Sequence, residues 1–320
     1  MQKAIVTTDL KTMGDDRICI VGIDRNYRCI RPVLPPPGVL RKHLSKGIIR
    51  KRLVIRPKAK ITFDFHKVPI EPPHIEDLGF NPKAIVYEGL CTDAEWEKLL
   101  KTISFRSVQD IYNGCLQENR WVEPGANTRS LGTVSQIQVI SVNIQERSGE
   151  RRYRLYFTDQ TGHRYDDVTI SDLAFRTFCD AELNRHSSPK SASQQVTGFL
   201  KSANRLYLRL GLARPWAPQD GRFGLRCWMQ VTGIYSFPDY FVGKSFADSE
   251  ATLRSKEAKT YDIEEVREKY PKAYTKWTEG EEDILRKDYL RGKTVEELAR
   301  DFQRKPGAIR SRLIRLGLLK

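Results

Sequence analysis

The stretch KWTEGEEDILRKDYLRGKTVEELARDFQRKPGAIRSRLIRLGLL, residues 276–319, carries the start and stop signals of three short helices. Thr278 and Thr294 are each followed three residues later by a glutamate, which is the spacing of a helix capping box. Pro306 suits the first turn of a third helix, because it has no N–H to leave unpaired. We therefore predict a small three-helix domain over residues 276–320.

Charge is sorted along the same stretch. Trp277 to Asp301 holds eight acidic and five basic residues, whereas Phe302 to Lys320 holds six basic residues and no acidic one. A helix that enters an anionic DNA groove needs this distribution. The expected inward-facing residues are Ile284, Leu285, Tyr289, Leu298, Phe302, Ile309, Leu313 and Leu316. The residues expected to contact DNA are Arg304, Lys305, Arg310, Ser311, Arg312 and Arg315.

Three short motifs follow one another here. They are Trp277-Thr278 with Glu281-Glu282-Asp283, then Val295-Glu296-Glu297-Leu298-Ala299, then Pro306-Gly307-Ala308-Ile309-Arg310-Ser311-Arg312-Leu313. With them the segment resembles the Myb/SANT-like helix-turn-helix tails of many bacterial proteins. The resemblance implies binding to duplex DNA. SANT-like modules also bind proteins, so a protein-binding adaptor is an alternative.

The whole chain has 320 residues, with 55 Lys and Arg against 40 Asp and Glu, and a net charge of +15. A surplus of this size favours a polyanionic partner, most often nucleic acid. No run approaches the roughly 18 apolar residues that a membrane span needs, and residues 1–10 lack the apolar core of a secretory signal. The six cysteines include no Cys-x-x-Cys pair and no zinc spacing with histidine. We expect reduced cysteines in a cytoplasmic protein with no metal, no cofactor and no membrane partner.

The first part of the chain contains short runs rich in Val, Ile and Tyr, separated by turn residues. The expected strands are residues 3–8, 17–23, 27–34, 53–56 and 60–65. Antiparallel strands this short and basic predict a small β-barrel. Two helices, over 92–103 and 107–117, are expected to bridge this barrel to the next domain.

Positive charge is concentrated in the first barrel. Arg41 to Lys60 holds nine bases and no acid, and so one-sided a run is stabilised by an anion when it is ordered. Arg28 and Arg31 alternate with apolar neighbours and are expected on the strand face opposite the core. The residues expected to contact nucleic acid here are Arg28, Arg31, Arg41, Lys42, Lys46, Arg50, Lys51 and Arg52.

A second set of strands follows. The expected strands are residues 133–144, 151–158, 163–170, 205–210 and 225–234. A helix is expected from a cap at Ser171-Asp172 through Phe178, and a mobile polar loop over 184–195. OB folds bind single strands through a basic groove and stacking aromatic rings. The candidates are Tyr27, Tyr156, Tyr207 and Trp216, of which about half are expected to be core residues; we place Tyr156 in the binding site.

Several short sequence motifs are distributed over residues 19–237. They are Cys19-Ile20-Val21-Gly22-Ile23-Asp24, Ile30-Arg31-Pro32-Val33, Pro73-His74-Ile75-Glu76-Asp77, Ser130-Leu131-Gly132, Leu210-Gly211-Leu212-Ala213-Arg214-Pro215, and Trp228 through Phe237. With them residues 1–242 resemble the prokaryotic dual OB-containing domain. The resemblance implies a nucleic-acid-binding platform found beside other prokaryotic modules, some in defence or mobile-element settings. It carries over no catalytic residue.

The expected fold is mainly β with α: two OB-like β-barrels with bridging helices and a small three-helix C-terminal domain. The first barrel with its helices spans 1–125, the second 126–242, a charged linker 243–275 and the helix-turn-helix 276–320. We expect a non-catalytic protein that binds nucleic acid, with DNA favoured over RNA. The body would hold single strands or structured nucleic acid and the tail duplex DNA, as an accessory to a partner enzyme.

A metal-dependent nuclease is the alternative from another class. His163, Asp166, Asp167 and Asp172 form the one acidic cluster with metal-site spacing in the sequence, and a nuclease holds Mg²⁺ with two carboxylates and a phosphate. The simpler interpretation is that Asp166 and Asp167 lie at a strand edge and that Asp172 caps a helix. The sequence contains no phosphate loop, dinucleotide fingerprint or nucleophile elbow.

Overall fold

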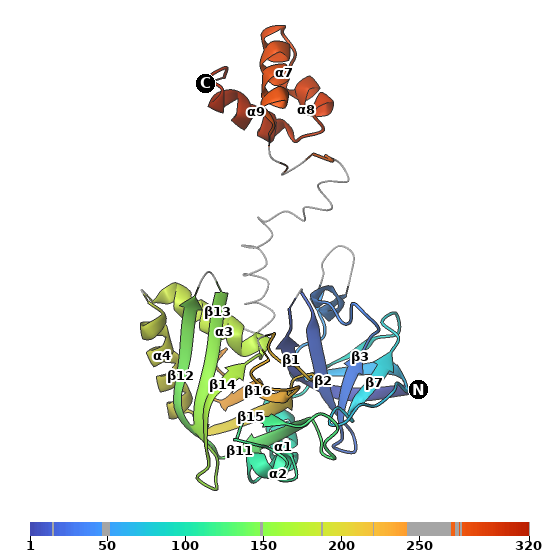
Figure 1. The fold of residues 1–320 in the computed structure, drawn as a ribbon. Helices are drawn as coiled ribbons and strands as arrows, with labels where there is room; N and C mark the ends of the chain where they lie inside the picture. Colours follow the sequence, from blue (N-terminus) through green and yellow to red (C-terminus); the bar gives the residue numbers. More distant parts are fainter. Residues whose placement is uncertain are drawn as a thin grey trace. The chain divides into compact units, whose positions relative to one another are not determined.

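The computed structural model describes residues 1–14, 16–46, 52–147, 150–186, 188–219, 221–241, 270–272, 275 and 277–319. Contacts divide the chain into two units, Met1–Ser249 and Glu250–Lys320. Figure 1 shows the strands of the first unit in two groups, one blue to cyan and one green to orange. Most of the expected linker, residues 243–275, lies outside the described residues.

The first sheet closes on itself. Its strand order is β1-β2-β3-β7-β6-β8, and β1 also pairs with β6. The strands are β1 (Gln2–Thr12), β2 (Ile18–Asp24), β3 (Cys29–Val33), β6 (Ala59–His66), β7 (Asp77–Phe80) and β8 (Val86–Leu90). β3 and β7 run parallel, whereas β1 is antiparallel to both of its neighbours. This closed circuit of five strands is the arrangement of an OB-like barrel.

Alternation and one bulge build this barrel. Along β6 the side chains of Ala59, Ile61, Phe63 and Phe65 are buried and those between them are partly exposed. A register shift between Thr7 and Asp9 bends β1. The start of β1 pairs with β6 and its end pairs with β2, so one bent strand closes the barrel.

The second sheet repeats the plan with a divided first strand. Its order is β12-β13-β14-β16-β15-β11-β9, with β10 paired to β16. The strands are β9 (Ser104–Phe105), β10 (Trp121–Val122), β11 (Leu131–Ser135), β12 (Gln138–Arg147), β13 (Glu150–Thr158), β14 (Arg164–Ile170), β15 (Arg205–Leu212) and β16 (Cys227–Phe237). The single strand expected over 133–144 is wrong, because Gln136 takes a positive φ of 54° and interrupts it. β11 then pairs with β15, and β12 pairs with β13. In the first barrel the two ends of the single strand β1 likewise pair with two different strands.

Helix α1 (Asp93–Thr102) joins the two barrels. Thr92 is its N-cap, and the side chains of Thr92 and Glu95 form a capping box. Trp96, buried on α1, meets the ring of Tyr235 edge to face at 4.9 Å. Helix α2 (Val108–Ile111) is much shorter than the helix expected over 107–117, since the chain turns through positive φ at Asn113 and Gly114.

Helices α3 (Leu173–Arg185) and α4 (Pro189–Ser202) follow β14. α3 starts at the expected Asp172 cap but continues past Phe178. The mobile loop expected over 184–195 is wrong. Ser188 caps α4, and Ala192, Val196 and Leu200 are buried at four-residue spacing, so the polar composition hides one apolar stripe.

Helix α4 also protects a sheet edge. The N–H groups of Val142 and Ile144 on β12 donate to the hydroxyls of Thr197 and Ser193 at 2.8 and 2.9 Å. Edge strands need such cover, because their unpaired backbone groups otherwise pair with other chains. The serines and threonines that make α4 read as a loop therefore bind the edge of β12.

The second unit contains α7 (Glu279–Leu290), α8 (Val295–Asp301) and α9 (Pro306–Arg315). Both capping boxes form: the Thr278 and Thr294 hydroxyls each accept a backbone N–H, and the glutamate three residues on accepts in return. Its buried core is Leu285, Leu298, Ala299, Phe302, Ile309 and Leu313. Ile284 is 55% exposed, so the expectation that it faces inward is wrong, whereas Leu285 is buried as expected.

Two further observations concern the whole described chain. The described helices include none long and apolar enough to cross a membrane. All six cysteines lie in the described part of the chain and are free thiols, as the sequence predicts. The remaining short elements are η1 (Arg41–Leu44), β4 (Ser45–Lys46) and β5 (Arg52–Leu53).

Candidate nucleic-acid interface

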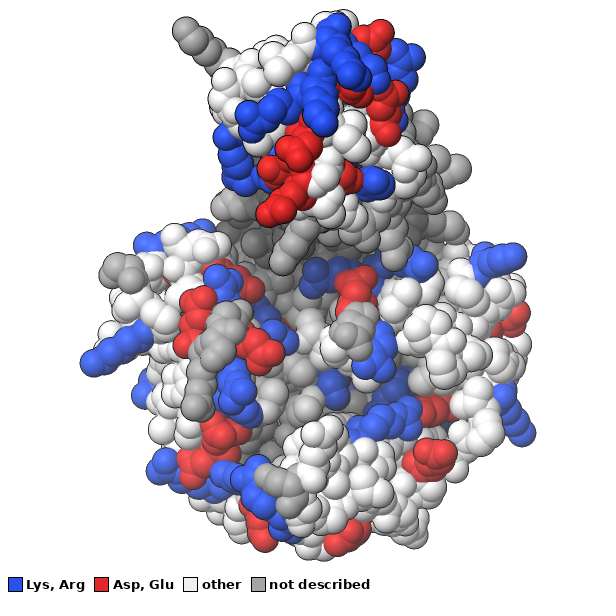
Figure 2. All heavy atoms as spheres, turned by 45° about the horizontal axis from the view of Figure 1, so that its top comes forward, with Lys and Arg blue, Asp and Glu red and all other residues white. Residues whose placement is uncertain are grey.

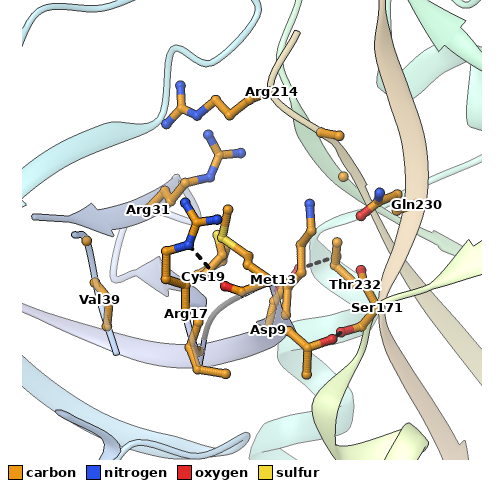
Figure 3. A pocket seen from close by; sticks show the side chains of 18 of the residues that line it. Asp9, Met13, Arg17, Cys19, Arg31, Val39, Ser171, Arg214, Gln230 and Thr232 are labelled. Carbon is orange, nitrogen blue, oxygen red and sulfur yellow. Dashed lines mark hydrogen bonds between the residues drawn. The ribbon is translucent and has the colours of Figure 1, made fainter. Parts of the chain in front are cut away.

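A cleft of about 750 Å³, the inter-barrel cleft, is lined by β1, β2 and β3 of the first barrel and by β14, β15 and β16 of the second. Its basic lining residues are Lys11, Arg17, Arg31, Arg151, Arg176 and Arg214, and its acidic ones are Asp9 and Glu150. Figure 3 shows Arg17, Arg31 and Arg214 on one side and Gln230 and Thr232 on the other. Figure 2 shows Lys and Arg side chains around the hollow in this face of the body.

Arg31 and Arg214 share one carboxylate in the wall of the cleft. Arg31 donates to Asp77 Oδ1 at 2.8 Å, and Arg214 pairs with the other oxygen of Asp77. Arg31 also donates to the Ser130 hydroxyl at 2.5 Å, and Ser130 donates to Glu76 at 2.7 Å. Arg31 is only 5% exposed, which corrects the expectation of a surface residue. The β3 face opposite its own core is covered by the second barrel, which supplies Ser130.

Lys11 has no such partner. It projects from β1, and among the described residues no hydrogen bond or ion pair reaches its ammonium group. Burial, together with the nearby charges of Arg31 and Arg214, lowers the pKa of Lys11 to about 8. An uncompensated, desolvated ammonium is costly unless an anion accompanies it. Lys11 is therefore the cation of the cleft with the most to gain from a bound anion.

Beneath the cleft a buried ion pair connects the barrels. Arg209 on β15 donates to Asp9 on β1 at 2.8 Å, and both side chains are completely buried. Arg209 also donates to the Thr133 hydroxyl at 3.0 Å and to the sulfur of Cys29 at 3.6 Å. Thr232 donates to the second oxygen of Asp9. These contacts hold the two walls of the cleft in one register.

An aromatic surface borders the cleft. Trp216 is 55% exposed and its ring lies 6.3 Å from that of Phe223, which in turn lies 5.3 Å from Trp228. The Arg226 guanidinium lies over Phe223 at 4.7 Å. Trp216 and Trp228 line a smaller hollow of about 380 Å³ that shares Thr169, Ala213 and Gln230 with the inter-barrel cleft. The inter-barrel cleft and the hollow beside Trp216 thus share part of their lining.

Residues 5–234 match the dual OB-containing domain. The chain belongs to this family. The two barrels described above agree with that description. A search of curated proteins found no match to the chain.

Within the dual OB body, the predicted basic residues do not form one site. Exposed Arg28 lines a separate hollow with Tyr27, on the turn between β2 and β3. Arg41 is half-buried and Lys42 is exposed on η1, next to the rim residue Val39 of the inter-barrel cleft. The backbones of Lys46 and Arg52 pair as β4 and β5, and Arg50 and Lys51 lie outside the described residues.

Of the four stacking candidates of the dual OB body, one is a core residue, where about half were expected to be. Tyr27 and Trp216 are 52% and 55% exposed, whereas Tyr207 is only 5% exposed and belongs to the core. Tyr156 is half-buried, and its hydroxyl donates to Asp167 at 3.2 Å. Trp216 is therefore the better stacking residue on the second barrel.

Lys11 and Arg214 are the cleft residues of the dual OB domain that the sequence does not single out. Arg214 stands inside the quoted Leu210–Pro215 motif, which marks the family but not the role of the side chain. Lys11 ends a strand whose neighbours give no sign of a binding site. Their role depends on residues of the opposite wall of the cleft, which come close to them only in the folded protein.

The three carboxylates of the nuclease alternative have separate partners. Asp166 pairs with Arg164 at 2.8 Å, and Asp167 lies 3.7 Å from Arg154. Asp172 is buried, where it accepts the N–H groups of Ala174 and Ile234, and burial raises its pKa to about 7. Among the described residues, no three His, Cys, Asp or Glu side chains are placed to hold a metal ion. Asp166 and Asp167 line the hollow beside Trp216, whereas Asp172 is buried at the start of α3 and does not line it.

In the second unit, two of the arginines expected on DNA are used internally. Arg304 is 2% exposed, donates to Glu281 at 3.1 Å and lies 4.2 Å over the Trp277 ring. Arg312 pairs with Glu282 and lies 5.6 Å from the same ring. This corrects their expected role as DNA contacts: both fasten the last helix to the start of α7. Acidic side chains at the start of α7 therefore pair with basic side chains from the C-terminal part of the same unit.

The other predicted residues of the tail remain at the surface. Arg310, Ser311 and Arg315 are exposed on α9, and Lys305 is half-buried at its start. The Arg310 guanidinium lies 4.0 Å from Glu296, at the limit of an ion pair, and both side chains are more than 60% exposed. Such an exposed pair is worth little, so Arg310 can exchange it for a phosphate.

Proposed function

We propose that this dual OB-containing protein binds nucleic acid and does not cut it. The observation that carries the proposal is the exposed Trp216 beside a cleft lined by six basic residues. OB-type proteins hold single strands in this way, with a basic groove for the backbone and aromatic rings for the bases. The net charge of +15 and the family of the body support the same function.

The body is tested by single-strand binding of the full chain. Labelled single-stranded DNA is titrated at about 50 and 200 mM salt, because phosphate contacts lose affinity as salt rises. Trp216→Ala should weaken binding by roughly 1–3 kcal/mol, and Trp216→Phe should retain most of it. Tyr27→Ala removes an equally exposed ring from the separate hollow and shows whether that hollow also contacts the strand. Binding that is unchanged by Trp216→Ala would remove the second barrel from the interface.

We further propose that the tail is a helix-turn-helix whose α9 meets duplex DNA. Support comes from the exposed Arg310, Ser311 and Arg315 on α9, and from the absence of any acidic residue in 302–320. The internal pairing of Arg304 and Arg312 supports it as well, because it fixes α9 against α7. DNA is favoured over RNA as the ligand, since helices of this kind enter the wide major groove of B-DNA.

Arginine substitution tests the tail. Arg315→Ala in the full chain should cost roughly 1–3 kcal/mol on a preferred duplex sequence. Arg286→Ala removes the same charge from an exposed position on α7 and is the matched control. Equal effects of the two substitutions would mean that only net charge matters and that α9 reads nothing.

A protein-binding adaptor is the second candidate for the tail. Ile284, Leu290 and Ile314 are 55%, 70% and 52% exposed, which is unusual for a unit with so small a core. If Ile314→Ser abolishes association with a partner enzyme while duplex binding persists, the tail binds both a protein partner and duplex DNA. The role of accessory to such an enzyme, in a defence or mobile-element setting, is supported by the family resemblance.

A further inference from the structure

The inter-barrel cleft has the size and charge of a site for a small phosphorylated molecule. Its volume of about 750 Å³ lies within the range of ligand pockets, and it is lined from both barrels. Asp77 is shared between Arg31 and Arg214, and Asp9 pairs with Arg209. Lys11 is left without a counter-charge among the described residues, so a ligand that brings an anion there completes the site.

A second group in the same cleft also lacks a partner. The side-chain oxygen of Gln230 is buried and accepts no hydrogen bond from the described residues. A buried acceptor without a donor costs free energy, so it marks a place where a ligand donor fits. Gln230 lines both the inter-barrel cleft and the hollow that Trp216 and Trp228 line. It therefore stands between the cationic site and the aromatic surface.

We propose that the inter-barrel cleft binds a nucleotide through its terminal phosphate. Lys11 and the half-exposed Arg214 hold the phosphomonoester, Gln230 accepts a hydrogen bond from the sugar or base, and Trp216 offers its ring to the base. A phosphomonoester fits better than a phosphodiester, because one of its two negative charges can face Lys11 and the other Arg214, whose partner Asp77 is shared with Arg31. The proposal rests on the proposed function only for the source of the nucleotide, which is either a free mononucleotide or the 5′ end of a strand.

Binding of a mononucleotide to the full chain tests the phosphate site. Titration calorimetry with adenosine 5′-monophosphate should show binding, and adenosine should bind about tenfold more weakly or not at all. Lys11→Met should reduce binding of the monophosphate by about tenfold or more, and Lys11→Arg should restore most of it. Lys83→Met removes an exposed lysine that does not line the cleft, and should change nothing.

The decisive variant is expected to fold. Replacing a desolvated ammonium with an apolar side chain of similar length removes a cost, so the thermal midpoint of Lys11→Met should equal or exceed that of the wild type. Arg214→Gln, at the more exposed rim, is the second variant and should also weaken phosphate binding. If both variants bind the monophosphate as the wild type does, or if adenosine binds equally well, the proposal is wrong.

Oligonucleotides separate the two sources and the two proposals. A single strand with a 5′-phosphate is compared with the same strand ending in a 5′-hydroxyl. A preference for the phosphorylated strand, lost in Lys11→Met, assigns the cleft to strand ends; monophosphate binding with no such preference assigns it to free nucleotides. Strand binding that ignores both the 5′-phosphate and Lys11, with no monophosphate binding, overturns the cleft proposal but leaves the proposed function intact. Monophosphate binding without strand binding overturns the proposed function but leaves the cleft proposal intact.

Discussion

The buried pair of Asp9 and Arg209 offers the sharpest test of how the two barrels are held together. We consider Arg209→Met, which keeps a long side chain but removes the charge that Asp9 faces. At 2.8 Å the attraction between the two charges is about 6 kcal/mol at an effective dielectric of 20. Desolvation of both groups offsets most of this in the intact pair. In the variant the desolvation cost of the buried Asp9 carboxylate remains, whereas its attraction to the Arg209 guanidinium is lost.

The expected loss of stability is therefore about 3–5 kcal/mol. The double variant Asp9→Asn/Arg209→Met removes both charges, keeps an acceptor for Thr232, and should be more stable than the summed single effects by at least about 2 kcal/mol.

Urea unfolding of the full chain measures these values. Tryptophan fluorescence follows the body, because four of the five tryptophans, Trp96, Trp121, Trp216 and Trp228, lie there. The reasoning is refuted if Arg209→Met costs less than about 1 kcal/mol, or if the effects of the two substitutions in the double variant are simply additive.

Three other outcomes are expected. Binding of the nucleotide monophosphate should weaken as pH rises from 7 to 9.5, because Lys11 has a pKa of about 8 and loses its charge over this range; the charged or titratable groups around it are Cys19, Arg31, Arg214 and Asp9. In calorimetry the Lys11→Arg variant should bind with no such pH dependence. A wild-type affinity that does not change with pH would contradict this prediction. The full chain should leave labelled DNA and RNA intact with Mg²⁺ or Mn²⁺ on a gel; cleavage that Asp167→Ala abolishes would establish a nuclease. Arg304→Ala should lower the unfolding midpoint of the tail, seen by circular dichroism, while Arg310→Ala leaves it unchanged; an unaltered midpoint in Arg304→Ala would contradict the internal role of this arginine.

Helix ends and strand patterns could be predicted because the signals that set them are local. Each capping box of the tail depends on a threonine and a glutamate three residues apart, and both boxes form at Thr278 and Thr294. The alternation along β6 likewise assigns its buried face. The same local reasoning failed for α4, because serines and threonines that face the edge of β12 have the composition of a loop.

What the sequence determined by itself was the family of the body, the helices of the tail and the surplus of positive charge. Which of those charges are available was decided only by the tertiary structure. Arg31 is neutralised by Asp77, 46 residues away, and Arg209 by Asp9, 200 residues away. The sequence around Lys11 gives no sign of a binding site, yet its ammonium group has no ion-pair partner among the described residues and lies in a cleft that both barrels line. The energy of a charge depends on burial and on partners distant in sequence, and neither is encoded in local pattern.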